Sequence, residues 1–182
     1  GNVVRTLDEA AVKTAQDDLS LSAAQIDDLS TQTFYNSDTT DASGKTILPA
    51  GSRVEQTFAP ARDVMLNDGS TARVRPHSRT IYDEGAPNSG INAATGQPYS
   101  LATTVISDAV TTGSGPDSVS VVETVSTTKN GYNPIDGAAA TSTTSGWTLG
   151  TPTTVTDNAG RVTKQVFDAR GKVVTTIAPA SN

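Results

Sequence analysis

Basic side chains recur at a regular two-residue spacing in one short stretch of the sequence, at Arg73, Arg75, His77 and Arg79. Successive side chains of a β-strand point to opposite faces, so a strand over residues 71–82 would place all four on one face. Such a row suits an anionic partner, for example a lipid head group, a wall polymer or an acidic part of the same assembly. The alternative is a solvated edge strand, in which charges and Pro76 block unwanted strand pairing.

The catalytic chemistry open to this chain is narrow. His77 is the only histidine, so a Ser-His-Asp triad would have to use it, and no Gly-x-Ser-x-Gly elbow accompanies it. The absence of cysteine removes thiol nucleophiles, disulfides and thiolate metal sites. Adjacent carboxylates point apart and cannot face each other across a sugar ring. They occur at Asp17-Asp18, Asp27-Asp28 and Asp83-Glu84. The sequence therefore predicts neither an enzyme nor a bound cofactor.

Cation and nucleic-acid binding also find little support. Asn36, Asp38 and Asp41 offer oxygen ligands in a polar loop over residues 36–44, but the loop lacks the glycine and distal glutamate of an EF-hand. We therefore predict no metal site. Residues 1–44 carry eight acidic and two basic side chains, which accounts for the net charge of −6. An acidic start repels phosphate backbones, and few aromatic residues are present to stack on bases, so no nucleic-acid partner is expected.

The composition favours strands with a thin core. Leu, Ile, Val and Phe make up about a fifth of the 182 residues, and Ser and Thr about a quarter. The first value is near the limit below which a chain buries too little apolar surface to fold alone. Valine and threonine suit half-solvated pleated surfaces. No apolar run reaches the roughly 20 residues that a membrane-spanning helix needs, so no membrane span is expected.

Local signals predict a small helical insert followed by strands. Thr6 with Glu9, and Ser22 with Gln25, have the spacing of helix capping boxes. We expect helices over residues 7–18 and 23–30, lying on a sheet rather than acting as a DNA-binding helix-turn-helix. Strands are predicted at 33–35, 54–58, 64–66, 71–82, 101–110, 119–128, 147–155, 161–167 and 172–177, with long loops at 36–44 and 84–99.

A short repeat closes the sequence. Asp157-Asn158-Ala159-Gly160-Arg161-Val162 returns eleven residues later as Asp168-Ala169-Arg170-Gly171-Lys172-Val173, preceded by Phe167. Aspartate initiates a turn by accepting backbone hydrogen bonds, and glycine takes the left-handed position. Each unit is then one strand and one turn, which cannot bury its own face. Residues 1–6 match residues 171–176 at four of six positions. We therefore expect the sequence to be part of a longer repeat array.

The pattern aromatic-Asp-x-x-Gly-Arg/Lys-Val resembles the tyrosine–aspartate (YD) repeat of the RHS family of bacterial surface and toxin proteins. Tyr82-Asp83-Glu84-Gly85 is a degenerate third copy. The resemblance implies a β-ribbon wound into a hollow, cocoon-like shell that in RHS toxins encloses a C-terminal effector domain. It also implies secretion or display at the cell surface. The Asp-Pro motif of the family's self-cleaving region does not occur here, so neither autoproteolysis nor an effector is assigned to this chain.

Our interpretation is a mainly-β shell segment. Residues 1–6 would form a repeat edge, 7–30 the helical insert, and 31–182 a strand-and-turn region with YD-like repeats at 157–177. The expected partners are other repeats of the same chain and an enclosed effector. The alternative is a stand-alone extracellular binding module, an adhesin or carbohydrate-contacting domain. For that reading, Trp147, Tyr132 and Tyr99 are the available aromatic contacts.

Overall fold

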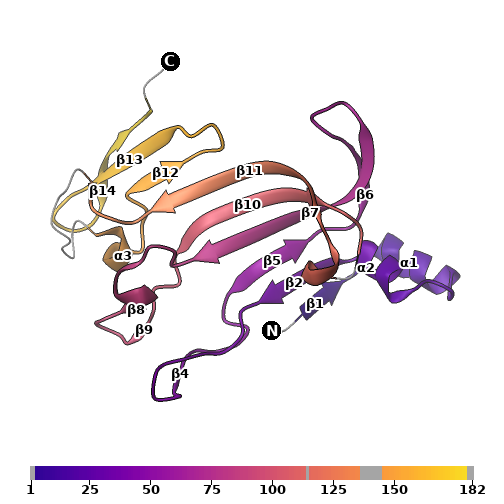
Figure 1. Cartoon of the computed structure of the whole chain (residues 1–182), viewed down its shortest axis with the longest axis horizontal. Coiled ribbons are helices and arrows are strands. Elements are labelled where there is room, and N and C mark those ends of the chain that lie inside the picture. Colours follow the sequence, from indigo (N-terminus) through magenta and orange to yellow (C-terminus); the bar gives the residue numbers. More distant parts are fainter. Residues whose placement is uncertain (1–2, 114, 136–144, 180–182) are drawn as a thin grey trace. The chain divides into compact units, whose positions relative to one another are not determined.

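The computed structural model describes residues 3–113, 115–135 and 145–179, and it confirms a mainly-β chain (Figure 1). A ten-stranded sheet has the order β1-β2-β5-β7-β10-β11-β12-β13-β14, with β6 paired to β7 off this path. The pairs with a resolved register are antiparallel, for example β1 with β2 and β13 with β14. Over the described residues the sheet is not closed, and β1 and β14 are the first and last strands of its order.

The chain divides into two compact units. The first contains Gly1–Arg79 and Ile106–Val125, and the second contains Thr80–Val105 and Ser126–Asn182. Three long strands, β7, β10 and β11, contribute residues to both units. Each unit is described below by itself.

The first unit contains the N-terminal elements. In chain order these are β1 (Val3–Thr6), α1 (Glu9–Asp17), α2 (Ala23–Asp28), β2 (Thr31–Tyr35), β3 (Thr39–Thr40), β4 (Thr46–Leu48), β5 (Val54–Phe58) and β6 (Arg62–Met65). Most of β7 (Thr71–Tyr82) and the 3₁₀ turn η2 (Pro116–Ser118) also belong to it. The expected loop at 36–44 contains one strand of the small β3–β4 hairpin.

The helical insert contains two helices, and the N-cap of one of them differs from the prediction. Ser22 and Gln25 form the predicted capping box of α2. In α1 the N-cap is Asp8, which accepts from the Ala11 backbone N–H at 2.8 Å, so the predicted box between Thr6 and Glu9 is wrong. Thr6 cannot cap the helix because it is paired with Thr31 in the β1–β2 ladder. Aspartate is as good an N-cap as threonine, and the ladder decides between them.

The second unit contains the C-terminal meander. Its elements are η1 (Pro87–Gly90), β8 (Ile91–Asn92), β9 (Gln97–Pro98), α3 (Gly146–Leu149), β12 (Thr154–Thr156), β13 (Val162–Phe167) and β14 (Val173–Ile177). Parts of β10 (Ala102–Val110) and β11 (Val121–Gly131) belong to it as well. The strand predicted over 147–155 is wrong, because α3 occupies its first part and a strand begins only at Thr154.

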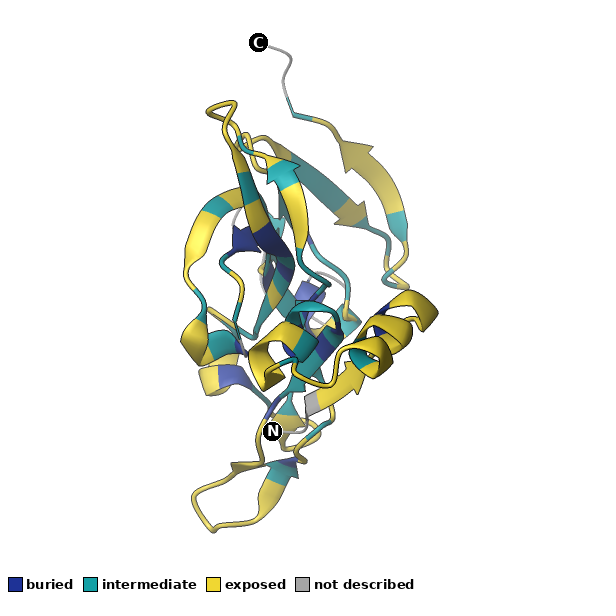
Figure 2. Ribbon diagram, turned by 90° about the vertical axis from the view of Figure 1, so that its right-hand side faces the viewer, coloured by how far each residue is buried: buried dark blue, intermediate teal, exposed yellow. Residues whose placement is uncertain are grey.

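The apolar core is thin. Among the described residues the buried apolar side chains are Ala11, Leu48, Phe58, Val74, Ala109, Val110, Tyr132 and Trp147. Many valines on the strands remain exposed, among them Val121, Val125 and Val174, at 58%, 60% and 56%. Figure 2 shows buried positions in the strands and exposed ones along α1 and at the hairpin tips. The low apolar content of the sequence thus corresponds to strands whose apolar side chains are in part exposed to solvent.

Candidate functional sites

Arg75 is the most buried charged residue of the first unit, with no accessible surface. Its guanidinium donates to Gln32 Oε1 at 2.9 Å and to the backbone carbonyls of Ser30, Ala59 and Gly113 at 3.0–3.1 Å. It also lies 5.2 Å above the ring of Phe58. Burial lowers the pKa of Arg75, against the opposing influence of Asp28 and Asp27, yet a guanidinium stays charged in proteins. Arg75 therefore ties β2, the end of β5 and the loop after β10 together.

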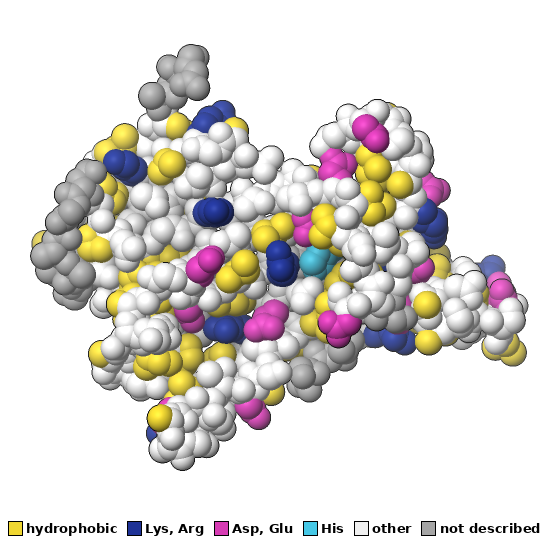
Figure 3. Space-filling view, viewed as in Figure 1, with side chains coloured by type: hydrophobic (Ala, Val, Ile, Leu, Met, Phe, Trp, Pro, Cys, Tyr) yellow, Lys and Arg dark blue, Asp and Glu magenta, His cyan; other side chains and the backbone are white. Residues whose placement is uncertain are grey.

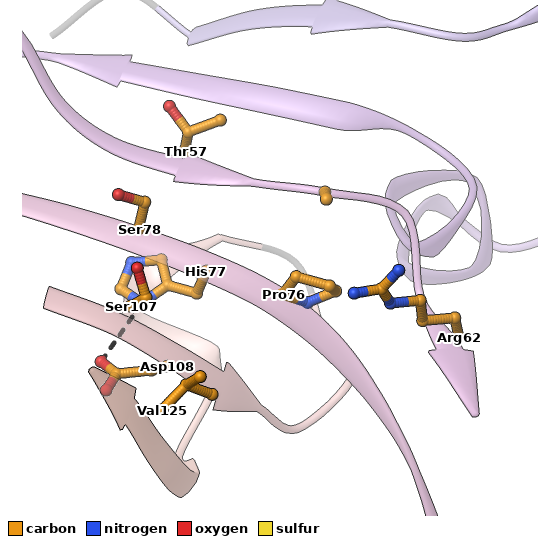
Figure 4. A pocket seen from close by; sticks show the side chains of 9 residues that line it. Thr57, Arg62, Pro76, His77, Ser78, Ser107, Asp108 and Val125 are labelled. Carbon is orange, nitrogen blue, oxygen red and sulfur yellow. Dashed lines mark ion pairs between the residues drawn. The ribbon is translucent and has the colours of Figure 1, made fainter. Parts of the chain in front are cut away.

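His77, two residues further along β7, is held between two strands. Its Nε2 lies 3.0 Å from Gln56 Oε1 on β5, and its Nδ1 lies 3.6 Å from Asp108 Oδ2 on β10. Figure 4 shows the imidazole and the carboxylate facing one another. The ring also stacks on Phe58 at 4.3 Å. Burial lowers the pKa of His77, and this outweighs the Asp108 carboxylate, which raises it.

The His77–Asp108 pair lacks the arrangement of a hydrolytic site. With Nε2 bonded to the Gln56 amide, that nitrogen has no hydroxyl to deprotonate, so the position that a nucleophile takes in a triad is filled by an amide. Within the described chain, His77 Nδ1 and Asp108 Oδ1 are buried without a hydrogen-bond partner. Cavities of about 330 Å³ and 290 Å³ are both lined by these two residues. The smaller one also contacts Gln56, Arg79 and Asp117.

The row of basic residues is divided by burial. Arg73 and Arg79 are exposed, whereas Arg75 and His77 are buried, at 0% and 8%. Arg73 Nη1 lies 3.8 Å from Asp63 Oδ1. The alternative interpretation, a solvated edge strand, is wrong, because β7 has β5 on one side and β10 on the other. On the face seen in Figure 3, basic and acidic side chains are interspersed and form no single patch. Binding of an anionic partner by the whole row stays a prediction.

The repeat residues form one hairpin turn, made twice. Asp157 Oδ1 accepts from the backbone N–H groups of Ala159 and Arg161, and Asp168 Oδ1 accepts from those of Arg170 and Lys172, all within 2.8–3.0 Å. Gly160 and Gly171 take the left-handed position at φ 76° and 77°. Phe167 ends β13 directly before the second turn. The turns join β12 to β13 and β13 to β14.

A third copy of this turn lies in the first unit, within the loop predicted at residues 36–44. Asp41 Oδ1 accepts from the N–H groups of Ser43 and Lys45 at 2.9 and 3.1 Å, and Gly44 has φ 84°. The sequence Asp41-Ala42-Ser43-Gly44-Lys45 fits the pattern acidic-x-x-Gly-cation. A search with that pattern, without requiring the following valine, would have found it.

Tyr82-Asp83-Glu84-Gly85 folds differently from the other copies. Asp83 is in the left-handed region at φ 60°, and its carboxylate accepts from the backbone N–H groups of Ser100 and Leu101 at 2.9 and 2.8 Å. The Asp83 backbone N–H donates to Leu101 at 3.0 Å. Asp83 therefore closes the long 84–99 connection, which carries the β8–β9 hairpin, and does not form the repeat turn.

The aromatic residues of the second unit form an internal cluster. Trp147 lies 4.8 Å from Tyr132 and 5.4 Å from Tyr99, measured between ring centroids. Trp147 Nε1 donates to Asn133 Oδ1 at 2.9 Å, and the Tyr132 hydroxyl donates to the Ala102 carbonyl at 3.0 Å. Trp147 and Tyr132 are buried, at 5% and 4%. A carbohydrate platform needs exposed rings, so these two do not supply one.

The oxygen-rich loop near the N-terminus is stabilised from within. Asn36 Oδ1 accepts from the Arg53 backbone N–H at 2.9 Å, and Asp38 Oδ1 accepts from that of Ala50 at 2.7 Å. Within the described ranges, no group of three or more histidine and carboxylate side chains could hold a metal ion. No helix in the part of the chain that the structure describes is long and apolar enough to cross a membrane.

Comparisons with family models, curated proteins and solved structures gave no match to this chain.

Proposed function

We propose that this chain is a structural element, a segment of the β-ribbon shell of a large secreted or surface RHS-type protein, whose partners are other repeats and an enclosed effector. The observation that carries the proposal is the recurrence of one hairpin turn, at 41–45, 157–161 and 168–172, within an antiparallel sheet that is not closed among the described residues. Repetition of one strand-and-turn unit in an open sheet is how a ribbon extends.

The surface supports the same proposal. Exposed valines follow β11, β13 and β14, at Val121, Val125, Val166 and Val174. Scattered apolar residues are normal on a soluble protein, but here they lie on strands whose own core is thin. In a wound ribbon, adjoining strands would cover them and supply the missing apolar contact. The role requires no catalytic group.

Unfolding of the isolated 182-residue protein tests the proposal. The slope of unfolding free energy against urea concentration scales with the surface exposed on unfolding. A ribbon segment should give a shallow, broad transition in which the two units unfold separately and bind a hydrophobic dye before unfolding. Circular dichroism would follow the unfolding of the whole chain. The fluorescence of Trp147 would follow the unfolding of the second unit. One sharp transition of a monomer, coincident for both probes and with the slope of a compact 182-residue domain, would overturn the proposal.

A further inference from the structure

Among the residues that the structure describes, β14 has β13 as its only neighbouring strand, and its second edge carries unusual side chains. The strand consists of Val173, Val174, Thr175, Thr176 and Ile177, which are all β-branched and uncharged. Val174 and Ile177 are 56% and 47% exposed, and β13 is its neighbour in the sheet. Natural sheets guard open edges with charge, proline or a bulge that turns the edge away. The charged Lys172 and the proline at position 179 lie outside this strand, and a bulge occurs only on its β13 side.

The same strand type occurs at the other end of the sheet. The sequence Val3-Val4-Arg5-Thr6 of β1 corresponds to Val173-Val174-Thr175-Thr176 of β14, with three of four residues identical. In the first unit β1 pairs with β2, and Val3 lies opposite Phe34. In the second unit β14 pairs with β13, and Val173 lies opposite Phe167. Both pairings therefore place a phenylalanine opposite the first valine of the strand.

The strand order identifies which edge of β14 is open. In the order of the sheet, β2 is the strand that follows β1, whereas β13 is the strand that precedes β14. Neighbours alternate in direction in an antiparallel sheet, so the first and ninth strands of the order run the same way. The open edge of β14 thus corresponds to the edge of β1 that β2 occupies.

We propose that the open edge of β14 binds an antiparallel strand of the β2 type, with an aromatic residue opposite Val173. The register follows from β1, where Val4 lies opposite Thr33 and Arg5 opposite Gln32. The partner therefore alternates threonine or glutamine with an aromatic residue at one defined position, as in Thr31-Gln32-Thr33-Phe34-Tyr35. This inference rests on the proposed function, because it specifies the strand that a neighbouring part of the ribbon supplies.

A copy of residues 30–36, appended after Asn182 through a Gly/Ser linker of about ten residues, tests the pairing in the full chain. A short flexible linker gives an effective concentration in the millimolar range, which a single added strand requires. The same heptapeptide added in trans to the unmodified protein is the second measurement. We expect amide NMR shifts and several-fold slower hydrogen exchange confined to residues 173–177 and to the added strand. In trans, the shifts should saturate with peptide concentration.

Two matched controls define the result. The appended strand carrying Phe34→Asp in the copy, and a scrambled strand of the same composition, should leave the amides of β14 unchanged. Equal protection by either control would overturn the proposed register. Protection of β1 instead of β14, or no change at 173–177 with the appended strand, would overturn the site. These outcomes are independent of the unfolding test, since a compact domain could still bind a strand at β14 and a ribbon segment could fail to.

Discussion

The two units build their interiors from different chemistry. In the first unit the centre is polar: Arg75 and His77 are buried against the ring of Phe58, and their partners Gln32 and Asp108 are buried as well. In the second unit the centre is aromatic, with Trp147 and Tyr132 in contact and their polar atoms paired. A chain poor in Leu, Ile and Phe thus forms the interiors that cover its sheet in two different ways. One interior depends on directional hydrogen bonds and the other on the area of a few large rings.

The largest expected effect is in the aromatic interior. Trp147→Ala should destabilise the second unit by about 3–5 kcal/mol, the usual cost of removing a buried tryptophan. Urea unfolding followed by circular dichroism gives the free energy, and amide exchange in β12 and β13 assigns it to this unit. Tyr99→Ala is the control, because Tyr99 lies at the margin of the cluster and is only half-buried. If both substitutions cost the same, the cluster is not centred on Trp147.

Arg75→Met tests the polar interior. It retains apolar bulk beside Phe58 but removes donors from Gln32 and from the carbonyls of Ser30, Ala59 and Gly113. Buried acceptors left without a donor cost about 1–3 kcal/mol. We therefore expect a loss in that range, seen as faster amide exchange in β2 and β5. The matched control is Arg73→Met on the same face of β7, where the side chain is exposed and a near-zero change is expected. A stabilised Arg75→Met variant would show that desolvation of the charge outweighs its hydrogen bonds.

Alanine substitutions at Gly160 and Gly171 distinguish the backbone strain of the turn from a steric clash with a neighbouring side chain. Gly160 and Gly171 have nearly the same positive φ, so a Cβ strains both turns by about 1–2 kcal/mol. A Cβ at Gly160 meets nothing within 4 Å, whereas one at Gly171 collides with the side chain of Leu149 on α3. Gly171→Ala should therefore cost more than Gly160→Ala in thermal unfolding. Adding Leu149→Ala to Gly171→Ala should remove the excess, and a persisting difference would exclude this contact as its cause.

The smallest expected effect is the pH dependence of the first unit. Burial lowers the pKa of His77, so the unfolded chain binds the proton more readily than the folded one. Stability should therefore fall as the pH drops through the unfolded value of about 6.5 and level off below the folded pKa. Unfolding free energies measured between pH 7.5 and 5 should show this slope, and His77→Gln should abolish it. A rise in stability on acidification would mean that the ion pair with Asp108 dominates.

Local signals in the sequence were sufficient for the two C-terminal repeat turns and for the strands β5 and β7. The prediction of 71–82 agrees with β7 to the residue, and 54–58 agrees with β5. Asp157, Gly160, Asp168 and Gly171 make the turn that their types require, since each turn is closed by bonds within five residues. The same locality explains why the Asp41 turn forms far from the other two.

Long-range contacts decided what those signals left open. Alternation placed Arg75 and His77 on one face with Arg73 and Arg79, but it could not show that β5 and β10 flank the strand and bury the middle of the row. Asp83 has repeat-like neighbours, yet Ser100 and Leu101 claim its carboxylate. The helix at Gly146–Leu149 occurs in a stretch whose residue types predicted a strand, where Trp147 contacts Tyr132.

By itself, the sequence determined the mainly-β fold class, the two C-terminal repeat turns and the small size of the apolar core. Composition and hydrogen bonds between near neighbours in the chain are sufficient for these features. Tertiary structure alone decided which charges are buried, where the aromatic rings gather and which strands lie at the margins. Burial and strand order depend on contacts between residues that are distant in the sequence, and only the folded sheet brings such residues together.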